Sequence, residues 1–503
     1  MYYHMYKDNI WRPKIFINKG VSLIKTELFI DGQYIPSETR RTFDVINPVN
    51  AQPMGQAAKA STADVEHALE AAQTAFKKWS RTNGDERAAR LKTAAAAIRD
   101  HEQELAHILT AEHGKPLNDA LKEIQGTASA FEYYGEEARR ISGEIAPAKS
   151  ATSRSLVIRQ PIGVVAAIVP WNYPVSLMSW KVAPALAAGC TVVVKPPELA
   201  PLATTKTIEV LSSAGLPTGA VNVVTGKASE IGDFLVSHPI TRVVALTGST
   251  EIGAHIMRVA SDGIKKLILE LGGHTPMVVF KDANLERALK DGVKRSFRNM
   301  GQICNAVNRI YVEQDIAEVF IDRFVKMTEQ MTIGDGLANP SIDLGPMIDQ
   351  SGIVRTQRHV DDALQKGARL ATGGGKPDAP ELQAGYFYKP TVLTEVRQDM
   401  LVMHEETFGP LVGIATFKGV EEAIALANST DFGLVTYGYT ESLSTAFAFG
   451  EGVESGTVAI NTVSPDSLYA PYPAWKLSGT GLELSRHGMN EYMNVKHLLL
   501  EIG

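Results

Sequence analysis

The sequence predicts an α/β protein with two parallel-sheet units, and three observations support this fold class. Short β-branched runs alternate with helical segments after Ser155, and a second alternation of the same kind begins after Glu270. The chain has 503 residues, which is more than one hydrophobic core usually serves, so we expect two or three domains.

The composition excludes several classes of protein. Hydrophobic residues make up 44% and charged residues 21%, and a formal net charge of −6 excludes a strongly basic nucleic-acid-binding surface. The sequence contains no run of about 18 uncharged apolar residues, so no membrane span is expected. The 2 cysteines exclude a disulfide framework and favour a reducing compartment. Because the first 25 residues lack signal-peptide features, we interpret them as an extension and expect a cytoplasmic protein.

The elements that precede the first sheet are expected to be long helices. Residues 61–142 are rich in Ala, Glu and Lys, and apolar residues recur there at helical spacing, as in Val65, Ala68, Ala72 and Phe76.

The first parallel sheet is predicted from four apolar runs: Val164–Val169, Thr191–Val194, Val221–Val224 and Val243–Leu246. Helices are expected between them at Pro201–Ala214 and Ser229–Ser237. Continuous apolar strands that alternate with helices indicate a parallel sheet covered on both faces.

The second sheet is predicted from a further set of strands: Met277–Phe280, Arg309–Val312, Val412–Phe417 and Val458–Ile460. Helices are expected at Ile316–Met331 and Val420–Asn428. The tail Glu491–Ile502 is again typical of a strand and has no partner near it in the sequence. Terminal strands of this kind often pair with another subunit, so we expect an oligomer.

Cys304 follows Gly301-Gln302-Ile303 and is a candidate nucleophile. A thiol attacks carbon as its thiolate, which requires a partly exposed or electropositive setting. The polar neighbours Gln302 and Asn305 disfavour burial of this residue. A lone cysteine is also often a small buried hydrophobic residue, and that alternative stays open from this segment alone.

Two other polar residues stand in unusual apolar surroundings. Glu270 lies between two leucines, and burial of its carboxyl group would raise its pKa toward the range of a general base. Asn172 follows an apolar strand in a loop bounded by prolines, where its amide can donate to a developing oxyanion. The alternatives are a glutamate that reaches solvent and a rigid aromatic turn.

Two segments at strand ends suggest a nucleotide site. Lys195 and Glu198 follow the run Thr191–Val194, and ligands of open α/β sheets bind at that end. The segment from Gly248 to Gly253 combines a strand end, a tight turn and a helix start, which favours a pyrophosphate. Ordinary helix caps have similar sequences, so this second pattern is weak by itself.

The order and spacing of these segments resemble the aldehyde dehydrogenase superfamily over roughly residues 27 to 503. Six family patterns are present: Pro-Trp-Asn-Tyr-Pro from residue 170, Lys-Pro-x-Glu from 195, Gly-Ser-Thr-x-x-Gly from 248, Glu-Leu-Gly-Gly from 270, Gly-Gln-x-Cys from 301 and Glu-x-Phe-Gly-Pro from 406. The chain is most similar to the branches that act on succinate semialdehyde and betaine aldehyde.

The resemblance implies the domain organisation. We expect a Rossmann-like parallel-sheet cofactor domain (residues 27–140 and 161–271), an α/β catalytic domain (272–455) and a small β oligomerisation arm (141–160 and 485–503). Residues 1–26 are then an N-terminal extension. The expected assembly is a homodimer or homotetramer, without metal, nucleic-acid or membrane partners.

The resemblance also implies a mechanism. Cys304 attacks the aldehyde, Asn172 and the Cys304 backbone N–H hold the oxyanion, and Glu270 activates the water that hydrolyses the thioester. Lys181 matches a position linked to proton relay, although a surface or structural lysine is the alternative.

The resemblance implies the cofactor contacts as well. They are Lys195 and Glu198 at the adenosine ribose, Ser249 at the pyrophosphate, Glu406 at the nicotinamide ribose, and Trp171, Gly226, Gly248, Gly253, Leu271 and Phe408.

The cofactor is expected to be NAD, with NADP as the alternative. The Glu198 carboxylate accepts a hydrogen bond from a free 2′-hydroxyl but repels a 2′-phosphate. NADP stays open because Glu198 can swing aside and Lys195 can pair with a phosphate.

The expected substrate is a short aldehyde with an acidic group, such as succinate semialdehyde or a three-carbon sulfo- or hydroxy-aldehyde, for example sulfolactaldehyde. Arg298 resembles the residue that binds the distal carboxylate in the succinate-semialdehyde branch, and a solvated helix charge is the alternative. Trp180 stands where that branch usually has a second Arg. A Trp at this position resembles the betaine-aldehyde and general-aldehyde branches. The alternative is that Trp180 only packs the wall of the substrate tunnel. Tyr472 and Trp475 lie where the family commonly has Pro-Phe-Gly-Gly, so we expect a stiffer, reshaped entrance loop.

Three other functions stay open at this stage. A betaine- or amino-aldehyde dehydrogenase is the first. An enzyme that passes the thioester to coenzyme A is the second, and Glu270 disfavours it because it supports hydrolysis. A catalytically silent structural protein is the third, and the presence of Cys304, Glu270 and Asn172 together disfavours it.

Overall fold

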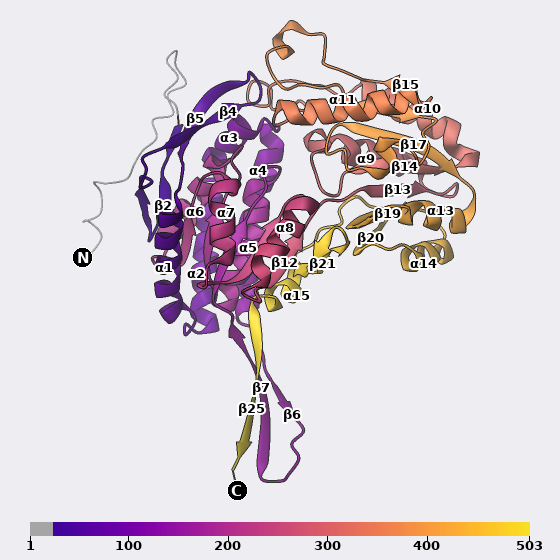
Figure 1. Ribbon diagram of the computed structural model, residues 1–503. Coiled ribbons are helices and arrows are strands. Elements are labelled where there is room, and N and C mark those ends of the chain that lie inside the picture. Colours follow the sequence, from indigo (N-terminus) through magenta and orange to yellow (C-terminus); the bar gives the residue numbers. More distant parts are fainter. Residues whose placement is uncertain (1–23, 503) are drawn as a thin grey trace.

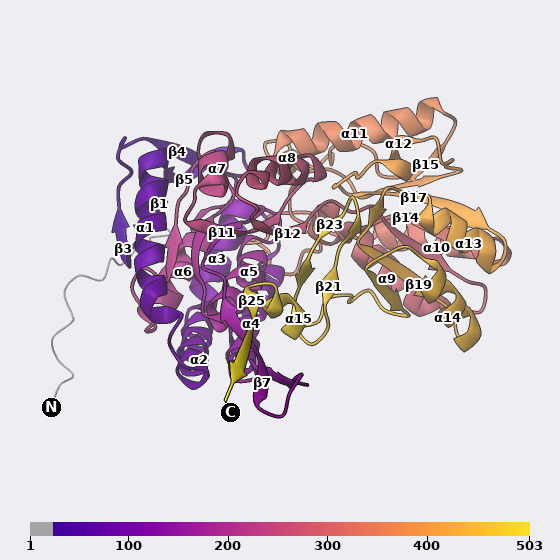
Figure 2. The ribbon, with the colours of Figure 1, turned by 60° about the horizontal axis from the view of Figure 1, so that its bottom comes forward.

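The computed structural model describes residues 24–502, which form two α/β units and a projecting β arm (Figure 1). The indigo-to-magenta unit lies beside the orange-to-yellow unit in both orientations (Figures 1 and 2). The expected N-terminal extension lies outside the described residues, except that its last residues form strand β1 (Ile24–Thr26). This strand pairs with β5 (Gln52–Ala58), which also pairs with β4 (Thr42–Asn47).

The first unit contains an eight-stranded sheet in the order β23-β12-β11-β8-β9-β10-β2-β3. Its parallel centre consists of β12 (Lys266–Glu270), β11 (Thr241–Thr247), β8 (Val164–Ile168), β9 (Thr191–Lys195) and β10 (Val221–Val223). The four predicted strands of this sheet are confirmed. The antiparallel edge strands β2 (Leu28–Ile30), β3 (Gln33–Ile35) and β23 (Gly479–Thr480) are 2 or 3 residues long, which is too short for a period to be read from the sequence.

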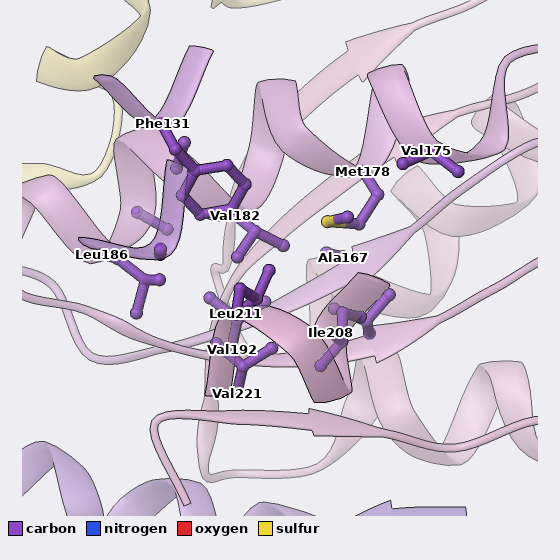
Figure 3. Packing of buried hydrophobic residues seen from close by; sticks show 14 of the residues in the cluster. Phe131, Ala167, Val175, Met178, Val182, Leu186, Val192, Ile208, Leu211 and Val221 are labelled. Atoms are coloured by element: carbon purple, nitrogen blue, oxygen red, sulfur yellow. The ribbon is translucent and has the colours of Figure 1, made fainter. Parts of the chain in front are cut away.

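Helices cover both faces of this sheet, because its strands are apolar on both sides. Val165 and Ala167 of β8 pack in one core cluster with Met178 and Leu211, whereas Val164 packs in another on the opposite face. Figure 3 shows the first of these clusters, with Val182 and Leu186 against Val192 and Val221. The helices are α1 (Thr62–Trp79), α2 (Gly84–Asp100), α3 (Glu102–His113), α4 (Leu117–Ala138), α5 (Pro174–Ala188), α6 (Leu202–Ser213), α7 (Ala228–Ser237) and α8 (Thr250–Ser261).

The second unit contains a seven-stranded sheet in the order β15-β16-β17-β14-β13-β19-β20. All neighbours are parallel except β15 and β16. The strands are β13 (Thr275–Val279), β14 (Val307–Glu313), β15 (Arg369–Thr372), β16 (Thr391–Thr394), β17 (Leu411–Phe417), β19 (Val435–Tyr439) and β20 (Thr457–Ile460). The helices are α9 (Leu285–Phe297), α10 (Ala317–Glu329), α11 (Gln350–Gln365), α12 (Leu401–His404), α13 (Gly419–Asn428) and α14 (Leu443–Gly452).

The arm consists of β6 (Glu144–Ala146), β7 (Ser153–Pro161) and β25 (Met493–Glu501), and it projects below both units in Figure 1. The tail is therefore a strand, as predicted, and β7 of the same chain pairs with it in antiparallel register.

No helix within residues 24–502 has both the length and the apolar character that crossing a bilayer requires. The remaining short elements are β18 (Phe432–Gly433), β21 (Tyr472–Pro473), β22 (Trp475–Lys476), β24 (Leu482–Glu483) and α15 (Ser485–Asn490).

The fold class predicted from the sequence, α/β with mostly parallel sheets, is thereby confirmed. The domain boundaries stay a prediction.

Candidate active site

A cleft of about 490 Å³ lies at the carboxyl ends of the central strands of the first sheet, and residues of both units line it. Asn172 and Ser249 contribute from the first unit, whereas Glu406 and Phe408 contribute from the second. The cleft brings together eight of the residues predicted to contact substrate or cofactor: Trp171, Asn172, Gly248, Ser249, Leu271, Cys304, Glu406 and Phe408.

Cys304 is half-buried at this cleft, so the alternative of a sealed structural cysteine is wrong. The turn before it is strained, because Asn299 and Met300 both adopt left-handed backbone conformations, with φ of 54° and 59°. Such conformations cost on the order of 1–3 kcal/mol per non-glycine residue. Gly301 continues the left-handed turn, and a Cβ atom there would lie 2.2 Å from the carbonyl oxygen of Gly409. Close packing at Gly301 and hydrogen bonds between Asn299 and Gln302 hold this turn in place before the thiol.

Glu270, the last residue of β12, is buried beside the Cys304 thiol. Burial and the nearby Glu483 carboxylate raise the pKa of Glu270 to about 7. Burial and the charge of Glu270 raise the pKa of the Cys304 thiol well above its usual range. Neither Glu270 oxygen has a well-aligned hydrogen bond from a described residue, so the carboxyl group is free to exchange a proton with the thiol or with water.

Asn172 is buried in the loop between β8 and α5 and points its amide at the nucleophile segment. Its Nδ2 atom donates to the backbone carbonyl of Gln302 at 3.1 Å. A primary amide has two N–H donors, so one remains for an oxyanion formed at Cys304. The three residues predicted to be catalytic therefore lie together.

Lys181 is completely buried, so the alternative of a surface lysine is wrong. Its Nζ atom lies 2.7 Å from Glu483 Oε1 and donates to Thr247 Oγ1 at 2.6 Å. Both partners are absent from the sequence-based predictions. Thr247 is a polar residue at the carboxyl end of a buried strand, the same signal that pointed to Lys195. Glu483 gives no such signal, because it lies 302 residues from its partner.

The predicted nicotinamide-ribose ligand Glu406 lies across the cleft from the first unit. Its Oε1 atom accepts from the backbone N–H of Gly273 at 3.0 Å, and burial raises its pKa to about 7. A Cβ atom on Gly272 would lie 2.8 Å from Glu406 Oε2, so a side chain at residue 272 would displace this carboxylate. Arg355, which sequence reasoning missed, also lines the cleft and donates to the carbonyl of Thr407 at 2.7 Å.

Lys195 and Glu198 form a second polar group at the end of β9. Lys195 Nζ lies 3.7 Å from Glu198 Oε1, which also accepts from the backbone N–H of Ala228 at 2.7 Å. Gly226, just before α7, has a φ of 144°, and a Cβ there would lie 3.2 Å from the backbone nitrogen of Ala60. The residues predicted to contact the adenosine ribose are thus two opposite charges at the carboxyl end of β9.

The N-terminus of α8 lies in the cleft, with Ser249 as its capping residue. A Cβ on Gly253 would lie 2.4 Å from Leu271 Cδ1, so this glycine is required for close packing of the helix on Leu271. The helix N-terminus and its backbone N–H groups are suited to a pyrophosphate. Most of the predicted cofactor residues therefore line this cleft, whereas Lys195, Glu198, Gly226 and Gly253 lie outside its lining. Within residues 24–502, no group of three or more His, Cys, Asp and Glu side chains could hold a metal ion.

The three predicted substrate residues lie in two places. The Trp180 and Tyr472 rings are 5.8 Å apart, and the Tyr472 hydroxyl accepts from Asn305 next to the nucleophile. Buried Arg295 donates to the same Asn305 side chain at 2.9 Å, a contact that sequence reasoning missed.

Arg298 lies in a separate groove, which has a volume of about 570 Å³ and also includes Lys122, Lys290 and Lys294. Its Nε atom lies 3.7 Å from Asp119 Oδ2. The Arg298 charge is thus partly balanced inside the chain.

Tyr472 and Trp475 lie in two short strands, β21 and β22, and the predicted stiffening of this loop stays a prediction. Tyr472 is buried, whereas Trp475 is 49% exposed, so only the tyrosine contributes to the interior of the site.

Comparison with known proteins identifies the chain. Residues 34–498 match the model of the aldehyde dehydrogenase family. The chain is 39% identical to 3-sulfolactaldehyde dehydrogenase from Pseudomonas putida, with 96% of this chain and 98% of that protein covered. It is also 39% identical to an NADP(+) succinate-semialdehyde dehydrogenase from Escherichia coli, with 95% and 98% covered.

Solved structures agree with this result. The fold matches a crystal structure of an NADP-dependent enzyme from E. coli with a TM-score of 0.93 at 39% identity, covering 95% of this chain and 98% of that one. It matches betaine aldehyde dehydrogenase from Staphylococcus aureus in complex with NAD+ with a TM-score of 0.93 at 33% identity, covering 95% of each chain. The chain therefore belongs to the aldehyde dehydrogenase family and is an NAD(P)-dependent oxidoreductase.

Proposed function

We propose that this enzyme oxidises a small aldehyde with an acidic group, such as succinate semialdehyde or sulfolactaldehyde, to its carboxylic acid through a thioester on Cys304. The observation that carries the proposal is the closeness of three groups: the Cys304 thiol and the Asn172 amide line one cleft, and the Glu270 carboxyl group is buried beside the thiol. These groups supply a nucleophile, a base and an oxyanion donor.

The residues act in sequence. Cys304 loses its proton to water, and its sulfur bonds to the aldehyde carbon. Asn172 Nδ2 and the Cys304 backbone N–H then hold the oxyanion of the thiohemiacetal. The bound nicotinamide supplies the hydride acceptor. Glu270 removes a proton from water, which attacks the thioester, and the thiol leaves as the acid is released.

We propose that NAD is the preferred cofactor and that NADP is the alternative. The Glu198 carboxylate is already paired with Lys195 and the Ala228 N–H, so a 2′-phosphate would meet a fixed negative charge. Kinetics with both dinucleotides tests this: Glu198→Gln is expected to lower the KM for NADP while the KM for NAD rises.

The acidic substrate is supported by charge and by the names of relatives. Three lysines line the groove of Arg298, which favours an anion in that groove. Relatives at 38–39% identity are named for sulfolactaldehyde, succinate semialdehyde and glutarate semialdehyde, and each of these aldehydes has an acidic group. The second candidate is a betaine- or amino-aldehyde, supported by Trp180, Asp119 and the 38% identity to betaine aldehyde dehydrogenase from Bacillus subtilis.

Arg298→Ala tests the acidic substrate directly. The KM for an anionic aldehyde is expected to rise about tenfold because a charge-assisted contact is lost, with the KM for a neutral aldehyde unchanged. Lys290→Ala, in the same groove, is the matched control and is expected to have a smaller effect. An unchanged KM in Arg298→Ala, together with better turnover of cationic aldehydes, would establish the second candidate instead.

The other two candidates each have a decisive assay. Mass spectrometry of products with and without coenzyme A separates hydrolysis from acyl transfer. NADH formation against a panel of about twenty aldehydes separates an active enzyme from a silent member of the fold.

We further propose a cytoplasmic homo-oligomer. β25 lies at the edge of the arm and exposes apolar side chains, among them Val495 (63% exposed) and Leu499 (65%). An exposed apolar edge strand favours pairing with a second copy of the chain. The cytoplasmic location is inferred from the scarcity of cysteine, 2 in 503 residues, which is typical of a reducing compartment. Light scattering of the purified enzyme tests for a dimer or tetramer.

A further inference from the structure

A buried ion pair that the mechanism above does not use lies next to the oxyanion donor. Lys115 Nζ is 2.6 Å from Glu123 Oε2, and the two side chains are 1% and 0% exposed. Desolvation of both charges makes such a pair a poor source of stability by itself. Its position therefore calls for an explanation from the groups that it contacts.

Lys115 contacts the backbone of the residue that carries the amide. Its Nζ atom donates to the carbonyl oxygen of Asn172 at 2.8 Å and lies 4.0 Å from the centre of the Tyr173 ring. The same carbonyl accepts a second hydrogen bond from Asn299 Nδ2, at 3.3 Å, in the nucleophile turn. The peptide that follows Asn172 is thus fixed from two directions.

Glu123 holds the other side of the same loop. Its Oε1 atom accepts from the backbone N–H groups of Val175 and Ser176, at 3.0 and 3.1 Å. These are donors in the first turn of α5, whose N-cap residue, Tyr173, makes no side-chain capping bond. A carboxylate from α4 therefore satisfies donors that helix α5 does not satisfy itself.

We propose that Lys115 and Glu123 are positioning residues that fix the direction of the Asn172 amide toward the oxyanion; this inference rests on the proposed role of Asn172. One Nδ2 hydrogen of Asn172 is engaged by Gln302, so the direction of the other is set once the backbone is fixed. Donors that are already oriented stabilise a transition state without reorganisation, and loss of one such donor typically lowers kcat about 10²–10³-fold. Loss of orientation removes part of that effect.

A double-mutant cycle between Lys115 and Asn172 tests the proposal. The variants are Lys115→Met, Asn172→Ala and the double variant, assayed with NAD and the aldehyde that the unmodified enzyme oxidises fastest. We expect Lys115→Met to lower kcat about 10- to 100-fold, with the KM for NAD within about twofold of the unmodified enzyme. In the Asn172→Ala background, the same change is expected to cost less than about threefold, because the group that it orients is gone.

A matched control separates positioning from general loss of an ion pair. Lys206→Met removes the Nζ–Glu209 contact at 2.8 Å on α6, outside the cleft, and is expected to leave kcat unchanged. Equal losses of kcat in both Asn172 backgrounds would show a merely structural role and overturn the proposal, as would unchanged kcat in Lys115→Met.

Two further results keep the test decisive. An unchanged kcat in Asn172→Ala would contradict the proposed role of Asn172 itself, whatever the kcat of Lys115→Met. If Lys115→Met does not fold, Glu123→Gln replaces it, because an amide oxygen still accepts from the first turn of α5 while the charge that holds Lys115 is lost. That variant is expected to lower kcat about 3- to 10-fold with Asn172 present and to have no effect without it.

Discussion

Two buried lysine–glutamate pairs lie near the catalytic residues, one beside the Asn172 loop and the other near Glu270, and they differ in what surrounds them. Lys115 and Glu123, 2.6 Å apart, contact backbone groups of the Asn172 loop. Lys181 and Glu483, 2.7 Å apart, contact the Thr247 hydroxyl, and their charges act on Glu270.

The difference indicates two uses for the same chemical pair. In the first pair, each charged group forms hydrogen bonds with backbone groups, so the role of this pair is to fix the geometry of the Asn172 loop. In the second pair, Glu483 Oε2 has no partner among the described residues, and its charge raises the pKa of Glu270 while Lys181 lowers it. We expect this second pair to set when Glu270 holds its proton. Variants of the two pairs should therefore affect different steps.

Glu270→Gln is expected to have the largest effect, about a 10³-fold loss of steady-state turnover, because a general base contributes roughly 10²–10⁴-fold. Hydride transfer precedes the step that needs this base. Rapid mixing should therefore still show a burst of about one NADH per active site. Absence of a burst would place Glu270 before the thioester instead.

Asn172→Ala is expected to lower turnover about 10²-fold and to remove the burst, because the oxyanion donor acts when the thiohemiacetal forms. Stopped-flow absorbance of NADH measures both quantities. A burst of normal size in this variant would contradict the contrast between the two pairs.

Changes in the second pair are expected to shift the pH profile, with smaller effects on the maximal rate. Glu270 works as the carboxylate, so activity rises with pH through its pKa of about 7. Lys181→Met removes a cation that lowers this pKa, and the acidic limb should move to higher pH, with about a 3- to 10-fold loss at pH 7. Glu483→Gln removes an anion that raises it, and the limb should move to lower pH. Lys115→Met, as the control, should leave the limb in place.

The sequence was sufficient to predict the residues that belong to local motifs. Cys304, Glu270 and Asn172 each lie in a short pattern of glycine, proline or polar residues beside an apolar strand, and the structure brings all three together. The central strands were also predictable, because buried parallel strands are continuous apolar runs.

The partners of these residues were not predictable, because the contacts depend on the tertiary fold. Glu483 lies 302 residues from Lys181, and Lys115 lies 57 residues from the Asn172 carbonyl that it holds. A glutamate in a helix, such as Glu123, looks like any solvated residue until α4 and α5 pack together. The placement of Arg298 beside Asp119 is likewise a feature of packing, and it divides the predicted substrate residues between two places.

The covalent intermediate is the most direct test of the proposed chemistry. Glu270→Gln is mixed with NAD and aldehyde, quenched in acid, and digested for peptide mass spectrometry. We predict the acyl mass on the peptide that contains Cys304 and none on the peptide that contains the fully buried Cys190. An unmodified Cys304, with NADH formed in the same sample, would contradict the account.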